Sequence, residues 1–112
     1  MPDRTLTSPV NTVVIEGRIT GIDRRTMPSG DEAVTFRVVV ERPPRDRGPT
    51  GRVRVDTLDC VGWRADVRRR VEACDEGEHV RVEGTLRRRF WRAGAGPASR
   101  IEVEARRVTR VA

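Results

Sequence analysis

The sequence predicts an all-β fold, a single five-stranded barrel with one short helix between the third and fourth strands. Five runs rich in β-branched residues are separated by segments rich in glycine, proline or charge, which is typical of strands joined by turns. One further run has helical spacing and lies between the third and fourth of these strands. A chain of 112 residues is long enough for one domain with a modest core.

The N-terminal half predicts a leader and two strands. Residues 1–10 carry two prolines and no clear period, so we expect a flexible leader there and a domain over residues 11–112. The first strand is expected over Asn11–Thr20, where the interior glycine indicates a bulge or a sharp bend. A turn follows at Met27–Gly30, M-P-S-G, and the second strand is expected over Ala33–Glu41.

A proline-rich segment separates the second strand from the third. Arg42–Gly51 holds three prolines, two glycines and three arginines, which predicts an irregular, mobile, basic hairpin loop. Arg52–Trp63 is expected to return as the third strand. The helix is expected over Arg64–Cys74, where Val67, Val71 and Cys74 follow an i, i+4, i+7 spacing.

The C-terminal part predicts two more strands. These are expected over His79–Trp91 and Arg100–Val111, with a flexible turn at Arg92–Ser99 between them. Three strands, a helix and two strands is the order of an OB-fold barrel. In that arrangement the loops between strands two and three and between strands four and five frame the binding face.

Charge indicates the class of ligand. The net charge of +6 and the pI of about 11.2 favour a polyanionic partner. All 23 basic residues are arginines, which make bidentate contacts with phosphates and stack on bases. A genome rich in G and C would favour arginine codons as well, but the surface chemistry is the same in either case.

Two tryptophans lie at strand ends beside arginines. By alternation along the fourth strand, Trp91 falls on the outer face, whereas Val80, Val82, Leu86 and Phe90 fall on the core side. Phe36 on the second strand is also expected in the core. An exposed indole between guanidinium groups suits base stacking. The alternatives are a tryptophan that covers a barrel end or a subunit interface and, for Trp63, packing against the following helix.

Other classes of site find little support in the sequence. Cys60 and Cys74 are too few for a disulfide framework and too far apart for a metal site, and we expect both to be core residues in a reducing cytoplasm. His79 is the only histidine, and no paired acids show metal-ligand spacing. We therefore expect no enzyme, no metal and no cofactor. No signal peptide or long apolar run indicates export or a membrane span.

Four blocks in order resemble the bacterial single-stranded DNA-binding protein (SSB) family. They are N-T-V-V-I-E-G-R-I-T, R-T-M-P-S-G followed by V-T-F-R-V-V-V, D-T-L-D-C-V-G-W, and E-G-E-H-V-R-V-E-G-T-L-R-R-R-F-W. The similarity covers about Asn11 to Val108. It implies a homotetramer of OB domains in the cytoplasm, associated with the nucleoid and bound to single-stranded DNA without sequence specificity, in replication, recombination or repair.

The resemblance also identifies candidate contacts. By position, the stacking aromatics of the family correspond to Trp63 and Trp91, and its basic contacts to Arg25 and Arg89. With the arginines of the loops and the outer face, the candidate nucleic-acid-binding residues are Trp63, Trp91, Arg89, Arg87, Arg25, Arg37, Arg54 and Arg64.

Three departures from the family keep other functions open. Thr57 and Leu58 stand where the family usually has aromatics, and Pro43 and Pro44 stand where it often has one. The sequence ends at Ala112 without the acidic tail that recruits repair proteins, so we expect no partners by that route. The alternatives are a primosomal-type adaptor, dimeric and weak in DNA binding, and an RNA-binding OB domain.

Overall fold

The computed structural model describes residues 8–111, which form five strands and one α-helix. Most of the predicted leader, residues 1–7, lies outside the described residues. In chain order, the elements are β1 (Val13–Thr26), β2 (Glu32–Glu41), the short 3-10 helix η2 (Pro44–Asp46), β3 (Val55–Gly62), α1 (Ala65–Glu72), β4 (His79–Ala93) and β5 (Gly96–Arg110).

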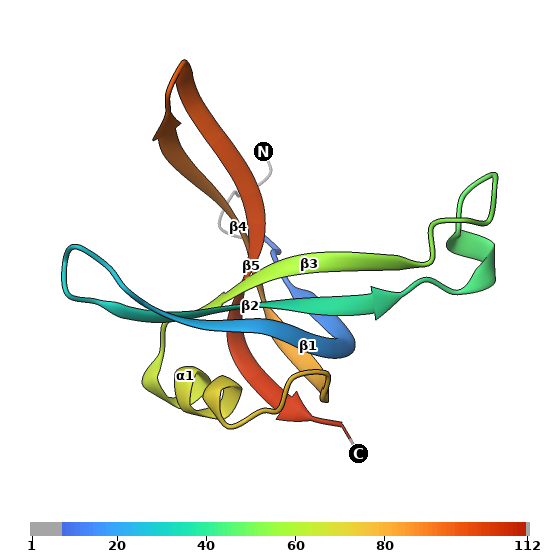
Figure 1. The fold of residues 1–112 in the computed structure, drawn as a ribbon, viewed down its shortest axis with the longest axis horizontal. Helices are drawn as coiled ribbons and strands as arrows, with labels where there is room; N and C mark the ends of the chain where they lie inside the picture. The colour runs from blue at the N-terminus through green and yellow to red at the C-terminus, as the bar shows by residue number, and fades with distance from the viewer. Residues whose placement is uncertain (1–7, 112) are drawn as a thin grey trace, which may run out of the picture.

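The strands close into a barrel in the order β1-β2-β3-β5-β4. All neighbours pair antiparallel except β3 and β5, which pair in parallel through Cys60↔Val103 and Val61↔Glu104. The predicted OB-fold barrel is confirmed, with α1 between β3 and β4. Hairpins project from the barrel in three directions, and the β4–β5 hairpin rises furthest above it (Figure 1).

The core lies inside the barrel, and valine is its commonest residue. Phe36, Cys60 and Cys74 are buried in it, as the sequence predicts. Helix α1 contributes Val67 and Val71 at its predicted spacing and contacts β5 and β2. Burial raises the pKa of the Cys60 thiol to about 12, so this cysteine stays protonated and unreactive.

Strand β1 bends so that it pairs with two neighbours. Val13–Arg18 pair with β4, and Arg18–Thr26 pair with β2, so the predicted bend near Gly17 coincides with this change of partner. The irregular register lies further along, between Thr20 and Asp23. There the Glu76 carboxylate accepts hydrogen bonds from the backbone N–H groups of Gly21 and Ile22, which fixes the start of the β1–β2 hairpin.

The β4–β5 hairpin differs from the prediction. Strand β4 continues to Ala93 and β5 begins at Gly96, so Arg92–Ser99 is not a flexible turn; a two-residue turn joins long strands. Leu86 and Phe90, predicted to point into the core, are 44% and 72% exposed. Their parity is right, but this part of the hairpin extends past the barrel, so residues 8–111 leave its inner face largely open.

The segment between β2 and β3 is more regular than predicted. It contains η2, so the expectation of no regular structure in Arg42–Gly51 is wrong. Strand β3 begins at Val55 rather than Arg52. Arg42 donates hydrogen bonds of 2.9 and 2.7 Å to the Asp56 carboxylate, and its guanidinium also bonds the Asp46 carbonyl, which orders the arm.

Candidate nucleic-acid interface

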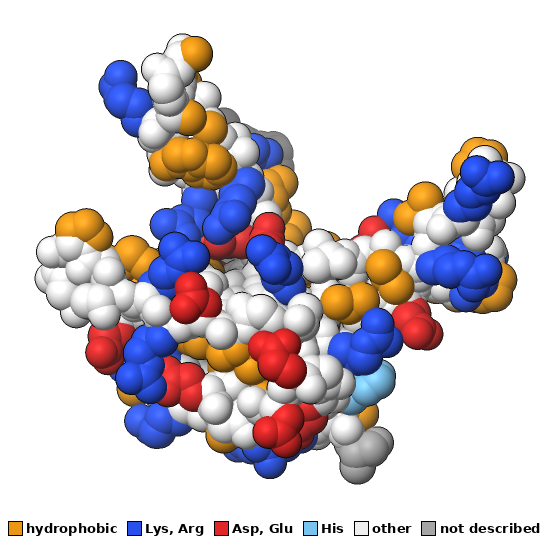
Figure 2. Space-filling model, viewed as in Figure 1, with side chains coloured by type: hydrophobic (Ala, Val, Ile, Leu, Met, Phe, Trp, Pro, Cys, Tyr) orange, Lys and Arg blue, Asp and Glu red, His pale blue; other side chains and the backbone are white. Residues whose placement is uncertain are grey.

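An open groove of about 440 Å³ lies between the end of the β1–β2 hairpin and the base of the β4–β5 hairpin. Arginines gather where the β4–β5 hairpin leaves the barrel (Figure 2). The groove is lined by Gly21, Arg25, Thr26, Met27, Thr35, Phe36, Arg37, Asp59, Cys60, Arg89, Phe90, Trp91 and Arg100. Residues of the segment between β2 and β3 are absent from this lining. The prediction that this segment borders the binding face therefore does not hold for the groove.

Strand pairing explains why the charged side chains that β2, β3, β4 and β5 contribute to the lining share one face. Directly paired residues of neighbouring strands point to the same side of a sheet, and residues two apart repeat it. Arg37 pairs with Asp59, and Arg89 pairs with Arg100. Arg87 and Glu102 form the next pair on the same side of the hairpin.

Trp91 offers an open aromatic surface at the rim of the groove. Its side chain is 47% exposed, which confirms the prediction of an exposed indole on the outer face. The Arg100 guanidinium carbon lies 5.9 Å from the ring centroid, a distance at which a cation and an aromatic face attract. Phe90 adds a second exposed ring to the lining.

Every arginine of the groove has a carboxylate nearby. Arg25 pairs with Asp23 at 3.0 Å, and Arg37 pairs with Asp59 at 3.4 Å. These four side chains are largely solvent-exposed, so the pairs are weak and can exchange with other anions.

Glu102 differs from the other acids because it is buried beneath two arginines. Its side chain is 3% exposed, and its oxygens lie 3.5 Å from Arg89 Nε and 3.9 Å from Arg100 Nη2. Burial raises the pKa of Glu102 above its ordinary range, while Arg89 and Arg100 oppose that rise and Asp59 adds to it. Two arginines of the groove wall therefore lie over a buried acid.

The structure brings four of the predicted residues together and separates the others. Arg25, Arg37, Arg89 and Trp91 line the groove. Arg87 shares the groove face of β4 but pairs with Glu104 at 3.5 Å, outside the lining. The remaining candidates, Trp63, Arg54 and Arg64, also lie outside it.

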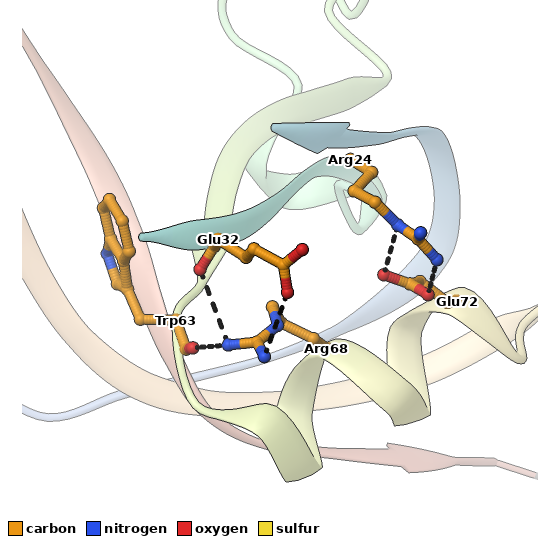
Figure 3. A network of polar contacts seen from close by, with 5 residues as sticks. All are labelled: Arg24, Glu32, Trp63, Arg68 and Glu72. Atoms are coloured by element: carbon orange, nitrogen blue, oxygen red, sulfur yellow. Dashed lines mark hydrogen bonds and ion pairs between the residues drawn. The ribbon is translucent and has the colours of Figure 1, made fainter. Parts of the chain in front are cut away.

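Trp63 follows β3 directly and is half-buried rather than exposed. By alternation it continues the row of Asp59 and Val61, the face that carries the groove. Its backbone carbonyl accepts a hydrogen bond from Arg68, which also lies 3.6 Å from the Glu32 carboxylate. The indole points away from this network (Figure 3).

Arg64 and Arg54 lie away from the groove lining. Arg64 is the N-cap residue of α1 and pairs with Asp66 at 3.2 Å. Arg54 lies where the arm returns to β3, and its carbonyl accepts the backbone N–H of Arg42. Of the helix arginines, Arg69 and Arg70 are exposed, whereas Arg68 is held by the contacts of Figure 3.

Sequence reasoning missed Phe90, Arg100, Met27 and Asp59 in the lining, and Glu102 beneath it. Phe90 has core parity, and its exposure depends on how far the hairpin extends. Arg100 and Glu102 reach the site only through their register opposite β4, which became visible once the turn was known to be two residues long. The G-A-G sequence at Gly94–Gly96 is the signal for such a tight turn.

Other kinds of site are not found in the described part of the chain. Residues 8–111 contain no group of three or more His, Cys, Asp or Glu side chains that could hold a metal ion. None of the helices in this range has the length and apolar character needed to cross a bilayer.

Comparison with known proteins identifies a family and a solved structure with a similar fold. The model of the Single-strand binding protein family matches residues 10–111. The fold is similar to a Plasmodium falciparum SSB in complex with ssDNA, with a TM-score of 0.70 and 21% identity over 88% of this chain and 89% of that one. No curated protein matches the sequence.

Proposed function

This chain belongs to the single-strand binding protein family and binds single-stranded DNA, and we propose that the DNA lies in the groove beside Trp91. The observation that carries the proposal is the half-exposed indole among Arg89, Arg100 and Arg37 in one groove. Bases present π-faces to the indole, and phosphates pair with the guanidinium groups. Neither contact reads base edges, so binding is independent of sequence.

The backbone of the strand supplies most of the attraction. Arginines that neutralise phosphates release the counterions condensed on DNA, so the logarithm of the binding constant falls with the logarithm of salt by about 0.7 per phosphate on a single strand. Arg25, Arg37, Arg89 and Arg100 are spread over β1, β2, β4 and β5, so several phosphates of one strand can be contacted at once.

Beyond the groove, the same face carries further side chains that the bound DNA can contact. Trp63 and Arg87 share the face by alternation, and we assign them a second stacking position and a further phosphate contact. Arg54 and Arg64 act at longer range through their charge. This distribution offsets the loss of stacking residues at Thr57 and Leu58.

We further propose that the chain acts without catalysis, as a homo-oligomer in the cytoplasm, in replication, recombination or repair. Support for oligomerisation comes from Leu86 and Ile101, apolar residues that are 44% and 50% exposed on the inner face of the β4–β5 hairpin. Copies on one DNA strand add avidity without new contacts.

Replacement of Trp91 tests the proposal. Trp91→Ala is expected to weaken binding to oligo-dT by about 1–3 kcal/mol, or about 5- to 150-fold, because one base loses its stacking partner. Val14→Ala is the matched control, since Val14 is 47% exposed like Trp91 but lies on β1, outside the groove lining. Fluorescence anisotropy of a labelled oligomer measures both. Equal affinities for the two variants would place the DNA elsewhere.

A further inference from the structure

Glu102 is a buried acid beneath Arg89 and Arg100, two arginines that line the proposed DNA groove. Its strand partners explain why it is there: Arg89 and Arg100 are directly opposite each other on β4 and β5. Like charges in that arrangement repel. Glu102 lies diagonally from Arg89, within 3.5 Å of Arg89 Nε and 3.9 Å of Arg100 Nη2, so one carboxylate offsets the repulsion of both cations.

The contacts of Glu102 with its two arginines allow another anion to take its place. Both distances are those of ion pairs rather than of short hydrogen bonds, and the two arginines are 39% and 50% exposed on the solvent side. A DNA phosphate that arrives from solvent meets the same two guanidinium groups from above. Phosphate and Glu102 are therefore alternative partners for one pair of cations.

We propose that Glu102 is an internal competitor of the DNA phosphate for Arg89 and Arg100 and thereby sets how tightly the groove holds single-stranded DNA. This inference rests on the proposed function, because it requires DNA in the groove. Glu102 keeps the free groove ordered and its cations neutralised, and it lowers affinity in return. It is a residue that tunes binding rather than one that contacts a base.

The other charges around Glu102 do not take its place. Asp59 on β3 is engaged with Arg37, and Glu104 on β5 is engaged with Arg87 and Arg106. Arg87, directly opposite Glu102 on β4, lies 3.5 Å from Glu104. When phosphate engages Arg89 and Arg100, Glu102 remains buried with no cation of its own, which favours its protonated form.

Glu102→Gln tests the competition, because it removes the charge and keeps the shape. We expect the variant to bind oligo-dT about 2- to 30-fold more tightly, because DNA no longer has to break the two ion pairs of Glu102 with Arg89 and Arg100. The salt slope should steepen by about 0.7, the increment for one further phosphate neutralised. Anisotropy titrations at several salt concentrations measure both quantities.

Glu16→Gln is the matched control. Glu16 pairs with Arg81 away from the groove lining, so this variant makes the same change in net charge. Its affinity and salt slope should stay close to those of the parent protein. Binding by Glu102→Gln that is no tighter than by Glu16→Gln overturns the inference, and weaker binding would mean that Glu102 only orients the arginines.

A second measurement uses the parent protein and needs no folded variant. Carbon-detected NMR titration of the Glu102 carboxyl group, with and without oligo-dT, should show a higher pKa in the complex. An unchanged pKa overturns the inference. Failure of the proposed function is distinguishable, because Trp91→Ala and Val14→Ala would then bind DNA equally well.

Discussion

Two glycines allow strands of the barrel to approach each other backbone to backbone. A Cβ atom on Gly17 would lie 2.2 Å from the carbonyl oxygen of Val39, and one on Gly84 would lie 2.0 Å from that of Glu104. Such contacts are far inside van der Waals distance, and backbone atoms cannot rotate away. These positions hold β1 and β4 at the curvature that closes the barrel.

Gly84→Ala is therefore expected to destabilise the fold by about 1–3 kcal/mol or more, the cost of forcing atoms into a packed site. Urea unfolding followed by circular dichroism measures the change. Gly94→Ala is the control, because a Cβ there meets nothing within 4 Å. If both variants unfold at the same urea concentration, the close approach at Gly84 does not matter for stability.

Single residues of the site were predictable where strand alternation alone decides their direction. Trp91, Arg89 and Arg37 follow from parity and charge. Phe90 did not, because its exposure depends on the hairpin extending past the barrel. Glu102 did not, because an acid in a basic segment reveals its role only through its register with Arg89.

Among the elements, the arm between β2 and β3 is held by a network around Arg42. Its guanidinium binds both oxygens of Asp56 and the carbonyl of Asp46, and Arg47 donates to the carbonyl of Arg42 at 3.2 Å. The Arg42 hydrogen bonds lower the pKa of Asp56 below its ordinary range. The network is therefore intact at neutral pH and is lost as the pH falls through this lowered pKa.

Asp56→Asn should loosen the arm without unfolding the barrel. The amide replaces the charged acceptor of both hydrogen bonds, so hydrogen exchange over residues 42–54 should speed up at pH 7 while exchange in β1 and β4 stays slow. Asp46→Asn is the control on the same arm, because Asp46 accepts the Arg42 hydrogen bond through its backbone carbonyl, which the substitution keeps. Equal exchange rates in the two variants contradict this account of the arm.

Element order was predictable, and element ends were less so. Turn residues and β-branched runs indicated five strands and a helix in the right order. The prolines of the arm concealed a 3-10 turn, because Pro44 fits the first position of a helix as well as a loop. Glycines at Gly94 and Gly96 suggested flexibility where they form a tight turn between long strands.

The whole molecule is a small barrel with long arms. Its radius of gyration of 16.6 Å exceeds the value of about 13 Å for a compact domain of this length. The arms extend the cationic surface well beyond the core, as Figures 1 and 2 show. A thin valine core thus supports a surface large enough to follow a flexible strand.

At this scale the barrel and its charge could be predicted from the sequence, but the position of the groove could not. The sequence predicted a binding face bordered by the loop between β2 and β3, whereas the groove lies between the β1–β2 and β4–β5 hairpins. The difference arises because β1 runs to Thr26 and carries Arg25 out beside β4.

The fluorescence of Trp91 tests most directly whether a base stacks on this residue in the groove. A Trp63→Phe protein leaves Trp91 as the sole indole. Titration with oligo-dT should quench its emission strongly at low salt, and added salt should restore it as the phosphate contacts weaken. Unchanged emission at saturation, with binding verified by anisotropy of a labelled oligomer, would contradict the account.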